Sequence, residues 1–341
     1  MSSAQPSPLA PEEIGRDATW LAQALDPNAG VLRLVAMDRD SYRAASFLDD
    51  RLMQQPVDAQ IVPWPDVEAA VEGELRTDAR WIFHIGHVGS TLVSRLLGEL
   101  DGVLAIREPR LLRDLALSPS DVRRGYVPSV PKLMSRTFGE DEVACVKATS
   151  FASEIAAELV PSGERALFMY ARPGNYVASV LAGENSLKEL HLLAEQRSRR
   201  LAGRSIHFPA ARNDADRAAA AWACEMTALE AAAAGMTDRR VEWAEFDCML
   251  ENMEAELSRI AGFFGFAADP GRLRDIAGGP LMQRYSKALE YEYSPGLRAE
   301  LIAEASGSHE QDIAGALAML AAVAEKSELL AQALRRATPE S

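Results

Sequence analysis

Residues 86–91 read Gly-His-Val-Gly-Ser-Thr and combine two glycines with a pair of hydroxyl side chains. Glycine permits tight backbone turns, and the hydroxyl pair stands where an apolar helical pattern begins. The first N–H groups of a helix have no partner within the helix, and the helix dipole is positive there, so such a turn binds anions. The expected ligand is a phosphate or sulfate, and the expected contacts are Gly86, His87, Val88, Gly89, Ser90 and Thr91.

Three charged side chains, Glu108, Lys147 and Arg172, stand at or just after the ends of short apolar segments. If these segments are parallel strands, their carboxyl ends share one edge of the sheet, where ligands bind in open α/β folds. Lys147 and Arg172 then lie on the same edge as the anion-binding turn. We expect both to converge on the anion.

The apolar pattern predicts the elements that must position these groups. Strands are expected at 81–85, 103–106, 143–147 and 166–170, because short apolar runs bounded by turn signals are typical of buried strands. Helical periodicity follows the turn, with one apolar stripe formed by Leu92, Leu96, Leu97 and Leu100. The alternation of strands and helices predicts an α/β fold in which helices flank a parallel sheet.

Four segments are expected along the chain. Residues 1–15 are expected to be a disordered tail, and 16–78 a helical segment packed on the main domain. The α/β domain should span 79–295, and 296–341 should form a C-terminal helical extension. The apolar stripe of this extension could pack on the domain or pair two subunits in a homodimer; it contains Ile313, Leu317, Leu320, Leu330 and Leu334.

Composition excludes several classes of protein. A net charge of −14 argues against general affinity for nucleic acid or anionic membranes. The three cysteines are widely spaced and lack metal-ligand spacing, so we expect neither disulfides nor a bound metal. The N-terminal residues lack an apolar signal region, and no apolar run reaches the length of a membrane span. We therefore expect a cytoplasmic protein with no membrane partner.

The turn differs from the loop of nucleoside triphosphatases. That loop has Gly, four residues and then Gly-Lys-Ser/Thr. Here His84 takes the first glycine position, and Ser90 follows Gly89 with no lysine between them. The missing lysine counts against triphosphate hydrolysis, although a kinase that uses ATP and magnesium on a small acceptor stays open as an alternative.

Three segments in order resemble the sulfotransferases that use 3′-phosphoadenylyl sulfate. Residues 84–92 resemble their 5′-phosphosulfate loop, 168–179 their 3′-phosphate segment, and 241–266 a later structural signature that ends in Phe-Phe-Gly-Phe. The resemblance covers residues 80–290. It implies a P-loop-type sulfotransferase fold of the bacterial kind, 3′-phosphoadenylyl sulfate (PAPS) as donor without a metal, and a hydroxyl or amine acceptor on a small molecule or carbohydrate.

The resemblance also implies roles for particular residues. Glu108 would be the base that takes the acceptor's proton, and Arg172 with Ser179 would bind the 3′-phosphate. Lys287 stands in Tyr285-Ser286-Lys287, which would replace the family's C-terminal Gly-rich loop. The phosphosulfate would be held by His87, Ser90, Thr91 and Lys147, of which His87 and Lys147 would act in catalysis.

One departure from the family keeps a third interpretation open. His87 stands where the family usually has a lysine or arginine, and histidine is only partly charged near neutral pH. A catalytically degenerate nucleotide-binding module, whose C-terminal helices bind a partner, is the alternative. The sequence does not identify the acceptor.

Overall fold

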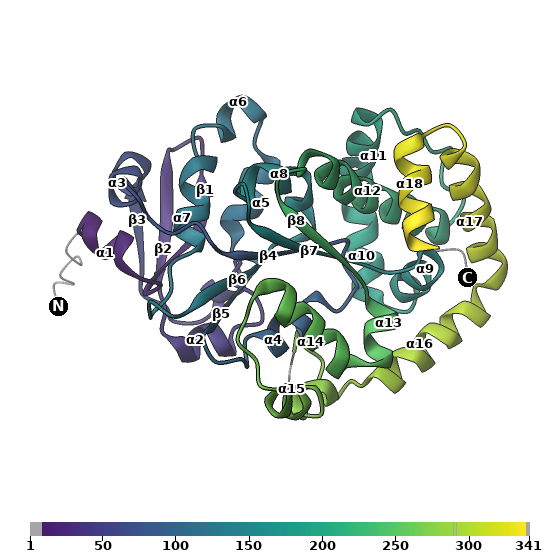
Figure 1. The fold of residues 1–341 in the computed structure, drawn as a ribbon. Coiled ribbons are helices and arrows are strands. Elements are labelled where there is room, and N and C mark those ends of the chain that lie inside the picture. The colour runs from purple at the N-terminus through teal and green to yellow at the C-terminus, as the bar shows by residue number, and fades with distance from the viewer. Residues whose placement is uncertain (1–8, 289, 291, 339–341) are drawn as a thin grey trace.

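The computed structural model describes residues 9–288, 290 and 292–338, in which helices cover both faces of a central five-stranded sheet (Figure 1). The strands are β4 (Arg80–His84), β5 (Val103–Arg107), β6 (Val143–Lys147), β7 (Arg165–Tyr170) and β8 (Arg240–Glu245). They stand in the order β5-β6-β4-β7-β8, and every neighbouring pair is parallel. The predicted α/β fold with a parallel sheet is confirmed.

Strand β4 lies at the centre of this sheet. The chain leaves it first toward β5 and β6 on one side and later toward β7 and β8 on the other. Such a reversal leaves a crevice beyond the carboxyl ends of the strands beside it. Residues 85–89, which join β4 to α4 (Ser90–Leu97), occupy that position.

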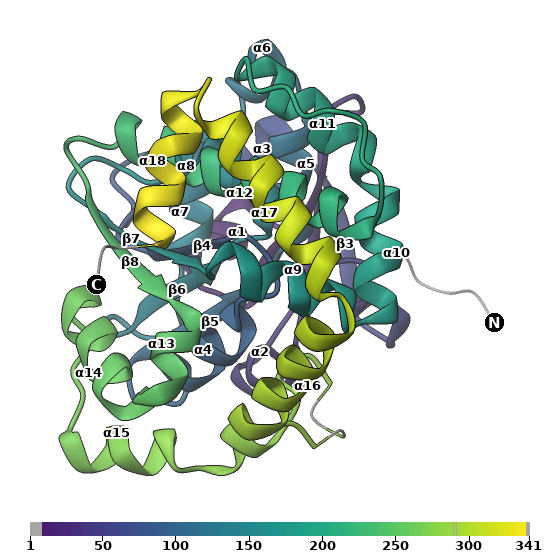
Figure 2. The ribbon, with the colours of Figure 1, turned by 90° about the vertical axis from the view of Figure 1, so that its right-hand side faces the viewer.

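Two groups of helices cover the sheet. Helices α4 and α14 (Met253–Phe264) lie on one face, whereas η3 (Ser150–Ile155) and α12 (Asp214–Gly235) lie on the other (Figure 2). The buried Trp222 of α12 donates from Nε1 to the carbonyl of Ala171 at 2.9 Å, which fixes this helix to the end of β7. Other helices join or flank these elements: α5 (Arg110–Leu117), α6 (Ser120–Arg123), η2 (Val127–Ser129), α7 (Val130–Met134), α8 (Ala156–Leu159), α9 (Pro173–Leu181), α10 (Glu184–Leu192), α11 (Ala194–Gly203), α13 (Phe246–Glu251), α15 (Pro270–Ala277) and η4 (Pro280–Gln283).

The N-terminal segment 16–78 differs from the helical segment expected. It contains an antiparallel sheet of β1 (Trp20–Asp26), β2 (Val31–Ala36) and β3 (Ala59–Pro63), with the short helices α2 (Arg39–Ala44), η1 (Leu52–Gln54) and α3 (Trp64–Ala70). Residues 21–25 of β1 are all buried, so the sequence shows no strand alternation there. The turn that pairs β1 with β2 was the overlooked signal: Asp26 accepts from the N–H groups of Asn28 and Ala29, and Gly30 has a φ of 63°.

The boundary of the expected N-terminal tail also changes. Helix α1 (Pro11–Arg16) begins within it, and Glu13 bonds back to the N–H of Ala10 at 3.0 Å. Residues 1–8 of that tail lie outside the described part of the chain. The N-terminal sheet packs beside the central sheet's helices, with β1 against α5.

The C-terminal residues form α16 (Pro295–Ser308), α17 (Glu310–Ala324) and α18 (Glu328–Ala337). The stripe residues Ile313, Leu320 and Leu330 are buried within the chain, where α17 and α18 pack on α12. Glu230 of α12 is fully buried and forms an ion pair with Arg336, whose guanidinium lies 3.9 Å from the centre of the Trp243 ring. Packing inside the chain therefore accounts for this stripe, and pairing of two subunits stays a prediction.

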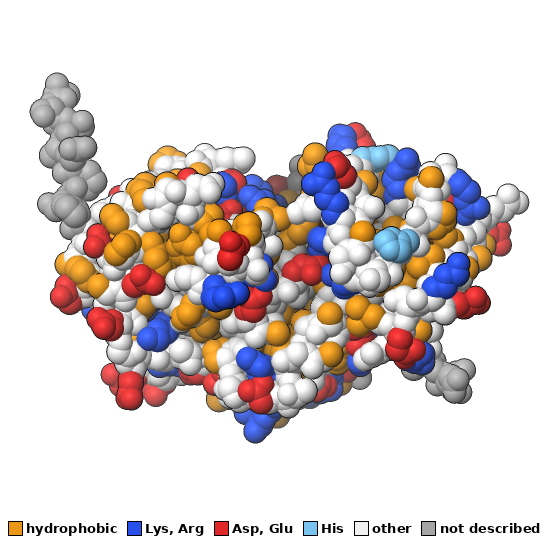
Figure 3. Space-filling model, turned by 90° about the horizontal axis from the view of Figure 1, so that it is seen from above, with side chains coloured by type: hydrophobic (Ala, Val, Ile, Leu, Met, Phe, Trp, Pro, Cys, Tyr) orange, Lys and Arg blue, Asp and Glu red, His pale blue; other side chains and the backbone are white. Residues whose placement is uncertain are grey.

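Surface charge is mixed on the face seen in Figure 3. Acidic and basic side chains alternate there with apolar ones and do not gather into one basic surface. Among the described residues, no helix is both long and apolar enough to cross a membrane.

The buried Glu230 gives a test of the C-terminal packing. We expect Arg336→Ala to lower the free energy of unfolding by about 2–3 kcal/mol, because it leaves a buried carboxylate without its cation. Arg335→Ala is the control: Arg335 pairs with Glu328 on the surface, so its loss should cost less than about 0.5 kcal/mol. Urea denaturation measures both, and equal losses would contradict this packing.

Candidate functional site

The loop between β4 and α4 has an unusual backbone. Gly86, His87 and Gly89 have φ values of 82°, 55° and 60°. Left-handed residues next to right-handed ones turn consecutive N–H groups toward one concave surface, which binds anions. The loop also leads directly into the first turn of α4 at Ser90. The structure thus has the tight turn at a helix N-terminus that the sequence predicts.

Gly89 is fixed by a second constraint besides its φ. A Cβ atom there would lie 1.9 Å from Cζ of Phe246, the first residue of α13. The buried Phe246 ring therefore packs directly on the loop backbone, and only glycine fits beneath it.

His84, at the end of β4, is a hydrogen-bonded core histidine. Its Nδ1 accepts from the N–H of Gly86 at 3.0 Å, so Nε2 carries the proton and donates to the carbonyl of Ala148 at 2.9 Å. Burial, together with the charges of Lys147 and Lys287, holds the pKa of His84 well below its usual range. The neutral ring fixes the start of the loop.

His87 lies in the loop itself and is also neutral. Its ring meets the edge of Tyr176 with the centroids 5.9 Å apart, and Nδ1 lies 3.5 Å from Oγ of Ser186. Burial, and then the charges of Lys287, Arg197 and Arg298, lower the pKa of His87 to about 3. Near neutral pH this side chain offers a hydrogen bond to an anion but no charge.

Glu108 and Lys147 meet at the ends of β5 and β6. Lys147 Nζ forms an ion pair with Oε1 of Glu108, and the same oxygen lies 3.8 Å from Nε2 of His84. Glu108 has a φ of 53°, and its N–H donates to the carbonyl of Lys147 at 2.7 Å. The Lys147 side chain is only 1% exposed, and burial lowers its pKa against the opposing effect of Glu108. The carboxylate thus lies beside His84, whose Nδ1 accepts from the loop.

The two arginines nearest to Glu108 in the sequence, Arg107 and Arg110, are engaged elsewhere. The guanidinium of Arg107 donates to the backbone carbonyls of residues 42, 43 and 45. Arg110 pairs with Asp50 and Asp114.

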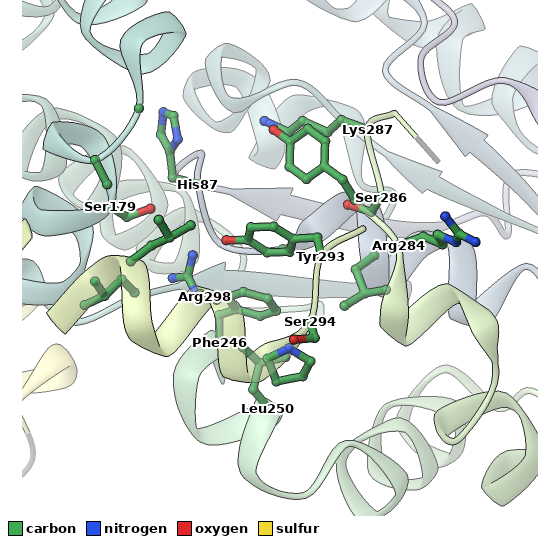
Figure 4. A pocket seen from close by; sticks show the side chains of 18 of the residues that line it. His87, Ser179, Phe246, Leu250, Arg284, Ser286, Lys287, Tyr293, Ser294 and Arg298 are labelled. Carbon is green, nitrogen blue, oxygen red and sulfur yellow. The ribbon is translucent and has the colours of Figure 1, made fainter. Parts of the chain in front are cut away.

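A cavity of about 440 Å³ opens beside the loop (Figure 4). His87 and Gly89 line it from the loop, Ser179 from α9, and Lys287 from residues 284–287, which line it together with 292–294. The rings of Tyr285 and Tyr293 in these two stretches lie 5.4 Å apart. Four of the predicted site residues therefore share one cavity.

Arg298 of α16 also lines this cavity and is 6% exposed. Its Nε donates to Oδ1 of Asp247 at 3.1 Å, and its guanidinium lies 4.9 Å from the centre of the Phe246 ring. The buried Nη2 has no hydrogen-bond partner among the described residues. Sequence reasoning missed this residue. The available signal was a cation in the first turn of a helix that begins at Pro295, where the dipole disfavours it.

The structure separates Arg172 from Ser179. Arg172 is the exposed N-cap of α9, is not among the described residues that line the cavity, and has Nη2 3.7 Å from Sγ of Cys248. Lys147 is likewise absent from that lining, because its ammonium is bonded to Glu108.

Three other predicted loop contacts, Val88, Ser90 and Thr91, are buried and do not line the cavity. Val88 is 1% exposed and apolar, and Ser90 and Thr91 are buried at the start of α4. Oγ1 of Thr91 is buried and has no partner among the described residues. In the described part of the chain, no group of three or more His, Cys, Asp or Glu side chains could hold a metal ion.

Comparison with known structures finds remote neighbours, and two of them are sulfotransferase domains. No protein-family model and no curated protein matches the chain. The sulfotransferase domain from the curacin biosynthetic pathway is 10% identical, with 70% of this chain and 99% of that domain covered and a TM-score of 0.41. The sulfotransferase domain from the Synechococcus PCC 7002 olefin synthase is 11% identical, with 67% and 89% covered and a TM-score of 0.41. Likenesses this remote do not define an activity.

The two loop glycines give a matched pair of variants. Gly86→Ala meets open space and carries only the strain of a positive φ, about 1–2 kcal/mol. Gly89→Ala adds a clash with Phe246, so we expect it to cost about 1–3 kcal/mol more. Denaturation of both variants measures the difference. A larger loss for Gly86→Ala would show that Phe246 does not hold the loop.

Proposed function

We propose that the protein is a sulfotransferase that moves a sulfuryl group from PAPS to a hydroxyl, or an amine, of a small molecule or carbohydrate. The observation that carries the proposal is the left-handed loop 86–89 at the N-terminus of α4, which opens on a cavity lined by the buried Arg298 and the exposed Lys287. Backbone N–H groups and a helix dipole at such a site favour a phosphate or sulfate.

The residues present fit a nucleotide with more than one anionic group. The cavity volume of about 440 Å³ lies within the range of small-molecule sites. Arg298 Nη2 is a buried polar atom without a partner among the described residues, and buried donors are normally satisfied. Arg298 lines the cavity, so an anionic ligand would satisfy this donor.

The donor would supply a sulfuryl group on an activated phosphate. Glu108 would take the acceptor's proton as the acceptor oxygen bonds to sulfur and the bond from sulfur to the phosphate oxygen breaks, which releases adenosine 3′,5′-bisphosphate. Lys147 bonds to Oε1 of Glu108 and so orients the carboxylate, while no described residue hydrogen-bonds to Oε2. The loop N–H groups and the neutral His87 would donate to the leaving phosphate, and Lys287 would supply positive charge.

Two other functions predict different ligands. A kinase would bind ATP with magnesium, which the loop disfavours because it lacks the lysine of triphosphate-binding loops. A degenerate nucleotide-binding module would bind the bisphosphate without transferring sulfate.

Ligand-induced stabilisation tests the donor. We expect adenosine 3′,5′-bisphosphate at about 1 mM to raise the melting temperature by at least about 3 °C, because a ligand at a hundred times its Kd stabilises the native state by about 2.7 kcal/mol. ATP with magnesium should give a smaller shift. No shift with the bisphosphate would refute the proposal, and a larger shift with ATP and magnesium would favour the kinase.

Glu108→Gln tests the base separately from binding. Glutamine keeps the size of the side chain but takes up no proton, so we expect transfer of labelled sulfate from PAPS to a panel of phenols, sugars and amines to fall at least about 100-fold. Stabilisation by the bisphosphate should not change. Full activity in the variant would sink the assignment of Glu108 as base, and wild-type binding with no product would favour the degenerate module.

A further inference from the structure

Helices α9 and α16 pack against one another and place Ser179 and Arg298 on the same wall of the cavity (Figure 4). We propose that this pair binds the 3′-phosphate of the nucleotide, and that Arg298, not Arg172, is its cation. The inference rests on the proposed function, since it presumes a ligand with two separate phosphates.

Arg298 is held in a fixed orientation. Its Nε donates to Oδ1 of Asp247, and Oδ2 of the same carboxylate accepts from Nδ2 of Asn175 at 2.8 Å. The guanidinium plane also lies near the ring of Phe246, which packs on Gly89 of the loop. The anion-binding loop and Arg298 are therefore positioned by the same aromatic side chain.

One nitrogen of the guanidinium lacks a protein partner. Nη2 is buried and has no hydrogen-bond partner among the described residues, and an unpaired buried charged donor is costly unless a ligand completes it. Asp247 occupies Nε and Tyr293 also bonds to this side chain, so Nη2 is the donor left for a phosphate. The Ser179 hydroxyl on the neighbouring helix supplies a further donor to the same wall.

The position of Arg298 within α16 also favours a bound anion. It is the fourth residue of a helix that begins at Pro295, so its charge opposes the positive end of the dipole. A bound anion at this helix start offsets that repulsion. The loop 86–89 is a second, separate anion site, so the cavity fits a ligand with two anionic groups.

Arg172 differs from Arg298 in its exposure and in its contacts. It is exposed, contacts Cys248 and is not among the described lining residues. If Arg298 is the cation, α16 of the C-terminal extension is part of the donor site, and a chain cut before residue 295 would lose the second phosphate site.

Isothermal titration of the full chain with two probes tests the assignment. Adenosine 3′,5′-bisphosphate carries both phosphates, whereas AMP carries only the 5′-phosphate. We expect the wild type to bind the bisphosphate at least tenfold more tightly than AMP. Arg298→Met should weaken the bisphosphate about 10- to 100-fold and AMP less than threefold, because only the 3′-phosphate loses its charged partner.

Arg172→Met is the matched control, and it should keep the wild-type preference. Arg298→Lys covers the case in which the methionine variant does not fold: it retains charge but loses the two-pronged contact, so the bisphosphate should weaken about tenfold with AMP unchanged. An unchanged preference in the Arg298 variants, or its loss in Arg172→Met, would overturn this assignment while leaving the sulfotransferase proposal intact. A wild type that does not bind the bisphosphate would instead refute the proposed function, and this inference with it.

Discussion

The start of α4 depends on a short loop whose backbone is left-handed at Gly86, His87 and Gly89. Two contacts keep it in that conformation: the Gly86 N–H donates to His84, and the Phe246 ring packs where a side chain at Gly89 would stand. The strain of a positive φ persists only where surrounding structure fixes it. Here β4 and the start of α13 provide that support, so the left-handed conformation of the loop is fixed by the fold itself.

Helix α4 then connects this loop to two distant parts of the chain. Arg95 is buried in α4; its Nε donates to the carbonyl of Ser286 at 2.9 Å, and its Nη2 donates to Oγ of Ser46 at 2.7 Å. One guanidinium thus joins residues 284–287, which line the cavity, to the N-terminal segment that carries Phe47. The Phe47 ring lies 5.7 Å from Nζ of Lys147, beside Glu108. The N-terminal segment accordingly packs beside the candidate base through the loop that follows α2.

Local sequence patterns predicted the strands of the central sheet and the tight turn. They did not predict the features that depend on packing between distant parts of the chain. The parallel strands follow from short apolar runs, and the left-handed turn follows from its glycines. The hairpin of β1 and β2 was missed because a strand buried along its length shows no alternation. Arg298 was missed because its direction depends on the packing of α16 against α9, more than a hundred residues earlier in the chain. Arg172 directly precedes the helix of Ser179, but only Ser179 lines the cavity, because the backbone of Arg172 as N-cap is not helical and the helical spacing of seven residues does not apply to it.

His87 is neutral near pH 7, so the positive charge around the cavity is carried by other residues. Burial lowers its pKa first, and the charges of Lys287 and Arg298 lower it further. Both cations come from residues after 284, beyond the last strand of the sheet. A lysine in the loop would be repelled by the same two groups, whereas a neutral imidazole can stand beside them and still donate one hydrogen bond. The neutral loop and the cations near the C-terminus therefore depend on each other. Lys287 and Arg298 carry the positive charge at this cavity, and their charges favour a neutral side chain at His87.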